Sequence, residues 1–189
     1  MPHEIEAKFK VASFAAVRRA LRAAGAARCC TVMESDRFFD TPGHAMLRGD
    51  STVRLRDTRQ VAGPTKVDAR PLLTFKGPGR RNTKLKIRKE IQTHVDDSAA
   101  VVEILAAAGL TPAFTLLKRR EVYHLRAGRG GQCEVLLDEL PVIGRFVEIE
   151  GPSQSAVLAV AKKLGLDQEP IRTSYARMMM DRHPLGTSR

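Results

Sequence analysis

The chain has 189 residues, of which 43% are hydrophobic and 28% charged, a composition typical of one globular domain and not of a disordered protein. Its 32 Lys and Arg residues against 21 Asp and Glu give a net charge of +11, and the resulting field attracts polyanions. No apolar stretch approaches the roughly 18 residues of a membrane-spanning helix, so we expect no membrane partner.

The sequence also bears on the compartment in which the protein works. Charged residues follow Met1 where a signal peptide needs an apolar segment, which argues against export. Cys29, Cys30 and Cys133 are too few and too irregularly spaced for a disulfide framework. We therefore expect reduced thiols and a cytoplasmic protein.

Helical periodicity predicts three helices, each with a polar N-cap and a glycine stop. The cap and stop residues are Ser13 and Gly25, Asp97 or Ser98 and Gly109, and Ser153 or Ser155 and Gly165. A further helix near the C-terminus would pack Met178–Met180 against the rest of the chain. We expect one domain over residues 1–183, followed by a flexible tail, 184–189.

Alternating apolar and polar residues predict eight strands between these helices. They are Glu4–Lys10, Arg37–Asp40, Val53–Asp57, Leu72–Lys76, Lys84–Thr93, Leu117–Leu125, Cys133–Asp138 and Arg145–Glu150. Many strands with few helices indicate an α+β fold around an antiparallel sheet. A shift of 84 residues aligns Glu6 with Glu90 and Gly25 with Gly109, which reflects either a chance match of Ala-rich helices or a duplicated unit.

The charged side chains share one side of nearly every predicted strand, because side chains alternate across a strand. Glu-x-Glu pairs mark the first and last strands, whereas Lys and Arg dominate the strands between them. Two interpretations are open. An antiparallel sheet can carry a solvated charged face. Alternatively, the sheet closes into a barrel with these charges around a water-filled bore and helices outside, and the segregated signs favour this arrangement.

A charged interior requires charged ligands, since buried charges without partners are prohibitively unfavourable. Carboxylates two residues apart on one strand suit hard cations such as Mg²⁺ or Mn²⁺. Arg and Lys opposite them suit phosphate oxygens. A metal ion bridging the carboxylates to a polyphosphate would neutralise both sets of charges.

Several segments resemble, in the same order, the CYTH superfamily of triphosphate tunnel metalloenzymes, and most closely its class IV adenylyl cyclase-like branch. The segments are Glu4–Lys8, Asp36–Pro42, Val53–Arg56, Leu73–Pro78, Lys118–Tyr123, Leu137–Leu140, Phe146–Gly151 and Ser174–Tyr175. The resemblance covers nearly the whole chain. It implies a closed eight-stranded antiparallel tunnel that binds a triphosphate and a divalent metal.

The resemblance also implies roles for particular residues. The expected metal ligands are Glu4, Glu6, Asp138, Glu148 and Glu150. The expected phosphate-binding residues are Lys8, Arg54, Arg56, Lys76, Arg88, Lys118 and Arg120. Glu6 and Lys8 are the expected catalytic residues, and Lys84, Lys86 and Glu90 are further candidates from strand parity.

We expect a metal-dependent enzyme that hydrolyses a nucleoside triphosphate such as ATP, or inorganic tripolyphosphate. The alternatives are an adenylyl cyclase that forms cyclic AMP and pyrophosphate, and a non-catalytic binder of polyphosphate or RNA. Phe38 stands where many relatives carry Tyr, which counts against a mechanism that uses that hydroxyl as a base. The absence of Trp counts against stacking on thiamine or single-stranded nucleic acid. A homodimer is left open.

Overall fold

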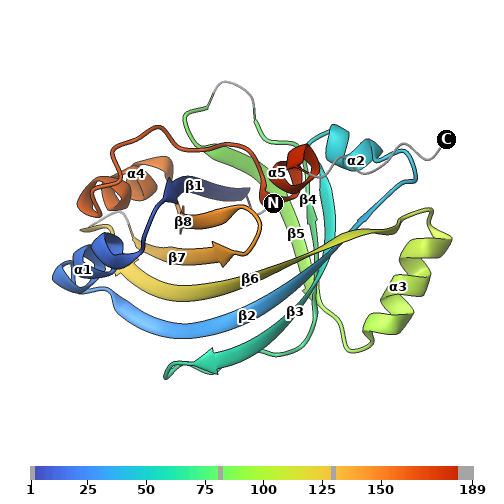
Figure 1. Cartoon of the computed structure of the whole chain (residues 1–189), viewed down its shortest axis with the longest axis horizontal. Coiled ribbons are helices and arrows are strands. Elements are labelled where there is room, and N and C mark those ends of the chain that lie inside the picture. The colour runs from blue at the N-terminus through green and yellow to red at the C-terminus, as the bar shows by residue number, and fades with distance from the viewer. Residues whose placement is uncertain (1–2, 81–82, 129–130, 183–189) are drawn as a thin grey trace.

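Eight antiparallel strands close into a barrel in the computed structural model of the chain, which describes residues 3–80, 83–128 and 131–182 (Figure 1). The strand order around the barrel is β1-β5-β4-β3-β2-β6-β7-β8, and β8 pairs with β1. The strands are β1 (His3–Val11), β2 (Ala27–Asp40), β3 (Thr52–Ala62), β4 (Leu72–Lys76), β5 (Lys86–His94), β6 (Thr111–Arg126), β7 (Gln132–Leu140) and β8 (Gly144–Glu150). The expected closed antiparallel α+β barrel is confirmed.

Helices lie on the outside of the barrel (Figure 1). They are α1 (Ala15–Ala23), α2 (Ala45–Arg48), α3 (Ser98–Ala107), α4 (Gln154–Lys163) and α5 (Tyr175–Arg182). None of the helices among the described residues is both long and apolar enough to cross a membrane.

The largest hydrophobic core lies outside the strands, between β1, β7 and β8 and the helices α1 and α4. Its strand residues, such as Phe9, Val135 and Val147, point out of the barrel. They pack with Leu21 of α1 and Val157 of α4. Each of these side chains is at most 1% exposed. Because truncating a buried Leu or Phe typically costs about 2–5 kcal/mol, this outer core stabilises the barrel and leaves its interior to polar residues.

The helix caps largely follow the sequence. Asp97 accepts hydrogen bonds from the backbone N–H groups of Ala99 and Ala100, and Ser153 accepts one from Ala156. Phe14 occupies the N-cap position of α1, where we expected Ser13, although the Ser13 hydroxyl still accepts from the N–H of Ala15.

Several boundaries differ from the prediction. β2 begins at Ala27, ten residues before the predicted strand, and β3 continues to Ala62, beyond the predicted end at Asp57. The short helix α2 was not predicted; it is held by Asp40, whose carboxylate accepts hydrogen bonds from the N–H groups of Met46 and Leu47. The three cysteines are buried and unpaired. The expected flexible tail, residues 184–189, lies outside the described residues.

The arrangement of strands fits the duplicated unit. Residues 3–11 of β1 shifted by 84 fall on 87–95, one residue from the bounds of β5, and α1 likewise falls on α3. Exchanging β1 with β5, β2 with β6, β3 with β7 and β4 with β8 leaves the order around the barrel unchanged. Two interior ion pairs, Arg88–Glu4 and Lys118–Glu34, join residues that are themselves 84 apart. The barrel is therefore built from two similar strand–helix–three-strand units.

Candidate triphosphate and metal site in the barrel

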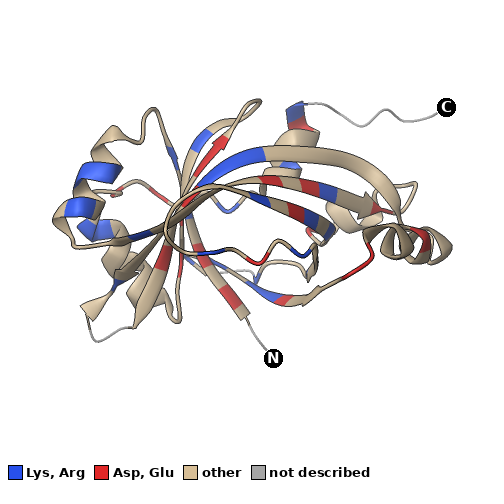
Figure 2. Ribbon diagram, turned by 90° about the horizontal axis from the view of Figure 1, so that it is seen from below, with Lys and Arg blue, Asp and Glu red and all other residues tan. Residues whose placement is uncertain are grey.

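The charged residues occupy alternate positions along the strands, on the side that faces the interior. Their Lys, Arg, Asp and Glu side chains therefore lie inside the barrel, around a cavity of about 340 Å³. All seven expected phosphate-binding residues line this cavity, as do four of the five expected metal ligands. The fifth, Asp138, is fully buried beside Arg120. Charged residues alternate with tan segments along the strands in Figure 2.

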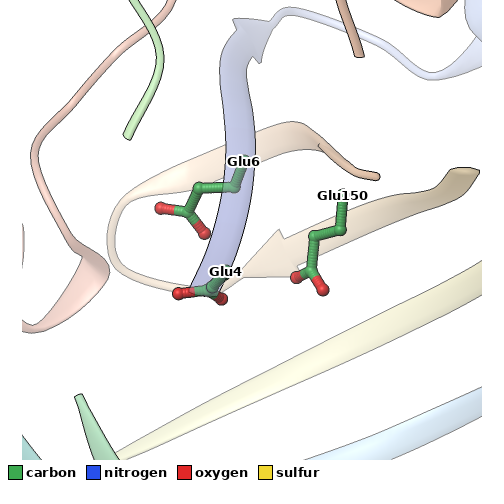
Figure 3. Close-up of side chains that lie close together, drawn as sticks. All are labelled: Glu4, Glu6 and Glu150. Atoms are coloured by element: carbon green, nitrogen blue, oxygen red, sulfur yellow. The ribbon is translucent and has the colours of Figure 1, made fainter. Parts of the chain in front are cut away.

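Three carboxylates from neighbouring strands, Glu4 and Glu6 of β1 and Glu150 of β8, form a group that we call the carboxylate triad (Figure 3). Each offers an oxygen, and these oxygens lie within 4.8 Å of one another. The register explains their proximity, because Glu6 is directly opposite Glu150 across the β1–β8 ladder. Such a group of oxygen donors is the type that hard divalent cations prefer.

The carboxylates of the triad differ in their protonation. Burial and repulsion from Glu4 raise the pKa of Glu150 to about 8. Burial would also raise the pKa of Glu4, but attraction from Lys76 and Arg88 outweighs it and lowers that pKa to about 2. Glu6 Oε1 is buried and accepts no hydrogen bond from the described residues. Its nearest cationic groups, on Lys8 and Arg88, are 4.0 Å away. A buried oxygen without a hydrogen bond, beside a carboxyl that resists ionisation, is the arrangement that a bound cation would relieve.

Six of the expected phosphate-binding side chains form what we call the basic wall. They are Arg54 and Arg56 of β3, Lys76 of β4, Arg88 of β5, and Lys118 and Arg120 of β6. Arg56 donates two hydrogen bonds to Asp36, at 2.6 and 2.9 Å, and lies 3.0 Å from Glu34. Lys118 lies 3.0 Å from the same Glu34 oxygen. Attraction to these bases outweighs burial and lowers the pKa of Glu34 to about 2. Glu34 and Asp36 thus hold two of the expected phosphate-binding side chains in place.

Arg54 is the least compensated base of this wall. Its Nη1 lies 3.6 Å from Asp36, its Nη2 donates to the Thr74 hydroxyl, and its buried Nε has no hydrogen-bond partner among the described residues. Burial, followed by repulsion from Arg56, lowers its pKa. A buried guanidinium with a free donor is suited to receive an anionic oxygen.

Arg120 stands at the centre of a third group. It donates to both oxygens of Asp138 and to Glu148, the last at 2.7 Å. Asp138 and Glu148, two of the expected metal ligands, are therefore engaged by a guanidinium and lie outside the carboxylate triad.

Comparison with known proteins agrees with this geometry. A sequence profile of the CYTH domain matches residues 2–175. The chain belongs to the CYTH family. Enzymes of this family that act on triphosphates depend on a divalent metal ion, which the donor set of the triad fits.

Solved structures similar to this CYTH protein share its fold. PH1819 from Pyrococcus horikoshii OT3 is 23% identical with a TM-score of 0.75, covering 95% of this chain and 99% of its own. A candidate adenylate cyclase from Vibrio parahaemolyticus is 20% identical, with a TM-score of 0.73 and coverages of 93% and 97%. HpAC1 from Hippeastrum, described as having a dominant triphosphatase activity, is 17% identical, with a TM-score of 0.63 and coverages of 98% and 98%. Comparison with curated protein sequences finds no match.

One end of the CYTH barrel is lined by the C-terminal segment. The Tyr175 hydroxyl donates to Asp138, and its ring lies 4.2 Å from Lys8 Nζ. Lys8 Nζ also donates to the carbonyl of Thr173 and lies 3.2 Å from Glu148. Ser174, Tyr175 and Ala176 all line the cavity, so the start of α5 and the residues just before it position Lys8 as well as bordering the bore.

The three further candidates, Lys84, Lys86 and Glu90, differ in whether they line the cavity. Glu90 lines the cavity and lies 3.4 Å from Lys76. Lys86 is buried 3.8 Å from Asp50, and burial together with the nearby Arg88 lowers its pKa to about 8. Lys84 is exposed and outside the lining.

Sequence reasoning did not assign roles to several lining residues. Glu34 fell in a segment that we did not predict as a strand, and Tyr175 lies in a matched motif to which no role was assigned. Leu72, Gln92, Val122, Glu134 and Leu136 also line the cavity. Strand parity was the signal that could have found Gln92 and Glu134, because they continue the inward-facing series of Glu90 on β5 and Asp138 on β7.

Proposed function

We propose that this CYTH protein hydrolyses a nucleoside or inorganic triphosphate in a reaction that depends on Mg²⁺ or Mn²⁺. The observation that carries the proposal is the convergence of the carboxylate triad and seven Lys and Arg side chains on one cavity. Oxygen donors select a hard cation, and fixed guanidinium and ammonium groups bind phosphate oxygens. The sequence arguments extend the proposal to a single domain over residues 1–183 that acts in the cytoplasm.

In this proposal the chain's own residues divide the chemistry between them. Glu4, Glu6 and Glu150 would hold the divalent ion, which supplies Lewis-acid activation of a phosphoryl oxygen. Lys8 of β1, together with Arg54 and the other bases of the wall, would bind the phosphates and stabilise the charge that develops on them. Because their positions are already fixed by Glu34, Asp36 and Glu148, little reorganisation would be needed during the reaction.

Cyclisation of ATP is the second candidate function. It requires space for a nucleoside next to the metal site, and a second cavity of about 520 Å³ is lined partly by Glu4 and Glu150 of the triad. We prefer hydrolysis because its nucleophile is a water molecule, whereas cyclisation requires a ribose hydroxyl that is oriented for attack.

Product analysis distinguishes the candidates. The protein is incubated with ATP or with tripolyphosphate, with Mg²⁺ or Mn²⁺ present, and the products are identified. Orthophosphate supports hydrolysis, cyclic AMP with pyrophosphate supports cyclisation, and no product with either metal supports a non-catalytic binder. Glu6→Gln should reduce turnover by at least about 100-fold, whereas the exposed Glu103→Gln on α3 should leave it unchanged.

A further inference from the structure

One part of the outer surface carries a concentration of arginine that the site in the bore does not explain. Between Glu6 and Glu34 the sequence holds six Lys and Arg residues and no Asp or Glu. Three of them, Arg18, Arg19 and Arg22, lie on α1. None of these three lines the cavity inside the barrel, so the proposed triphosphate site gives them no role.

Two further arginines lie beside α1 on the outer face of the sheet, Arg28 of β2 and Arg119 of β6. Arg18 and Arg119 each place a guanidinium nitrogen 2.7 Å from the same oxygen of Glu121. Arg28 is directly opposite Tyr123 in the β2–β6 ladder, and the Tyr123 hydroxyl donates to Glu121. We call this group the arginine face; it consists of Arg18, Arg19, Arg22, Arg28 and Arg119.

The arginine face has a large excess of positive charge. Glu121 is the one carboxylate, among the residues that the structure describes, that forms an ion pair with any of its members. Five guanidinium groups therefore share a single negative charge. Arg19, Arg22 and Arg28 are exposed, and the side chains that Glu121 fixes still have 40% and 38% of their surface accessible.

The duplicated unit shows that the fold does not require arginine at these positions of α1. The shift of 84 residues that places α1 on α3 aligns its three arginines with Val102, Glu103 and Ala106. The corresponding helix of the second unit thus forms without any Lys or Arg. The positive charge of α1 is therefore free to serve binding.

The exposed side of α1 offers charge but no apolar anchor. Val17 and Leu21 are buried in the outer core, which leaves no large apolar group of this helix to enter a membrane or to form the centre of a protein interface. Phe14 and Tyr123 are also buried, so neither ring can stack on an unpaired base. Guanidinium groups held on a helix and a sheet suit the phosphate oxygens of a nucleic-acid backbone.

We infer that the arginine face binds the phosphate backbone of double-stranded nucleic acid, independently of the site in the bore. A duplex carries one phosphate charge per roughly 1.7 Å of its axis, so guanidinium groups about one helical turn apart on α1 meet phosphates in any sequence. The face reads backbone charge and not bases. This binding needs no metal ion and leaves the bore unoccupied.

The test uses a fluorescein-labelled duplex of about 20 base pairs with 5′-hydroxyl ends, so that no triphosphate is present. EDTA is included to suppress any metal-dependent binding in the bore. Fluorescence anisotropy gives the Kd between about 50 and 300 mM NaCl. For the wild type we expect the logarithm of the association constant to fall with the logarithm of the salt concentration, with a slope of roughly −4 to −5 for five phosphate contacts.

A double variant, Arg19→Gln with Arg22→Gln, removes two exposed charges and keeps a good helix former at both positions. It should raise the Kd at about 50 mM NaCl by at least roughly tenfold and make the slope shallower by about 2. The control, Arg177→Gln with Arg182→Gln, removes the same charge from α5, which lies far from α1 (Figure 1). It should change the Kd by less than about twofold, since distant exposed charges are screened. Melting temperatures are measured for both variants to confirm that they fold.

Equal losses in the two double variants would overturn the assignment to the arginine face, as would a wild type that fails to bind the duplex at about 50 mM NaCl. RNA and DNA duplexes of one sequence should bind within about threefold of each other, and a preference above about tenfold would contradict recognition by backbone charge. Vesicles that contain phosphatidylserine provide the last comparison. Tighter binding to these vesicles than to the duplex, lost in the Arg19 and Arg22 variant, would show that the face binds a membrane surface instead.

Discussion

Single carboxyl groups show how strongly ionisation inside the barrel depends on the neighbouring charges. Glu150 and Glu4 lie in one triad, yet the pKa of the first is raised to about 8 and that of the second is lowered to about 2. The difference arises because Glu4 contacts Lys76 and Arg88, whereas Glu150 lies next to Glu4 itself. Without a cation, Glu150 is therefore held in its protonated form at neutral pH.

This protonation predicts how stability depends on pH. The carboxyl of Glu150 ionises near pH 4.5 in the unfolded chain but only near pH 8 in the folded one. Its contribution is therefore most favourable at low pH and is lost as pH rises from about 4.5 to 8. We expect the melting temperature of the metal-free protein to fall across this window, and Mg²⁺ to restore it at pH 8 by replacing the proton.

Glu150→Gln tests this expectation by differential scanning calorimetry. The amide cannot ionise, so the variant should show a flatter pH dependence and a smaller Mg²⁺ shift than the wild type. Glu103→Gln, on the exposed surface of α3, should behave like the wild type. A Glu150→Gln protein with the full pH slope and the full Mg²⁺ shift would show that another group is responsible.

Arg120 is the residue whose loss should be most damaging to the interior. Its guanidinium is hydrogen-bonded to Asp138 and Glu148, both at most 5% exposed. Arg120→Met would leave two buried carboxylates without this partner, which typically costs about 3–5 kcal/mol. Urea denaturation at pH 7 measures the loss. Arg177→Met removes an exposed pair with Asp181 and should cost less than about 0.5 kcal/mol, and equal losses in the two variants would contradict the argument.

Among the elements, the sequence predicted those whose side chains alternate cleanly. β4 was predicted with its observed bounds, because Leu72–Lys76 alternates between the core and the bore. β2 was predicted only from Arg37. Its register shifts between Arg28 and Cys30 and again between Thr31 and Val32, and from Val32 to Asp36 the residues do not alternate between apolar and polar. A bulge of this kind removes the period of two on which strand prediction depends.

Tyr175, the first residue of the C-terminal helix α5, connects this helix to the barrel interior. Tyr175→Phe loses the hydrogen bond to Asp138 but keeps the ring beside Lys8, so we expect it to cost about 1–2 kcal/mol of stability. Tyr175→Ala also loses the ring and should cost about 3–5 kcal/mol. Because Lys8 then loses part of its positioning, KM for the triphosphate should rise severalfold in Tyr175→Ala.

The control is the same substitution on the outer face of the barrel. The Tyr123 hydroxyl donates to Glu121, which also binds Arg18 on α1. Tyr123→Phe should therefore lower stability by about the same amount as Tyr175→Phe without changing KM. A KM that is unaffected in Tyr175→Ala would show that α5 has no influence on phosphate binding.

At the scale of the whole molecule, strand parity predicted which charges face inward but not which of them meet. The Glu-x-Glu pairs of β1 and β8 pointed to the interior, yet parity alone could not separate Glu150, in the triad, from Glu148, which is paired with Arg120 and Lys8. That distinction depends on depth along the bore and on the register between strands, which are set by the closure of the barrel and not by any one segment.

The net charge is also distributed in a way that the sequence does not reveal. Among the described residues that line the bore, seven are Lys or Arg and eight are Asp or Glu, so the excess that makes the chain +11 lies elsewhere. Part of it is on α1, where Arg19 and Arg22 are exposed. Figure 2 shows blue segments on this helix. The positive field of the whole chain is therefore distinct from the expected phosphate site in the bore.

Two kinds of polyanion binding should follow from this distribution. Binding to the exterior should need no metal and should disappear between about 50 and 500 mM NaCl, because exposed charges are screened. Binding in the bore should require a divalent ion, because the lining has no net positive charge, and should persist at high salt. Calorimetric titration with tripolyphosphate, with Mg²⁺ or with EDTA at both salt concentrations, separates the two. Tight binding at 500 mM NaCl with EDTA present would contradict the proposed dependence on the carboxylate triad.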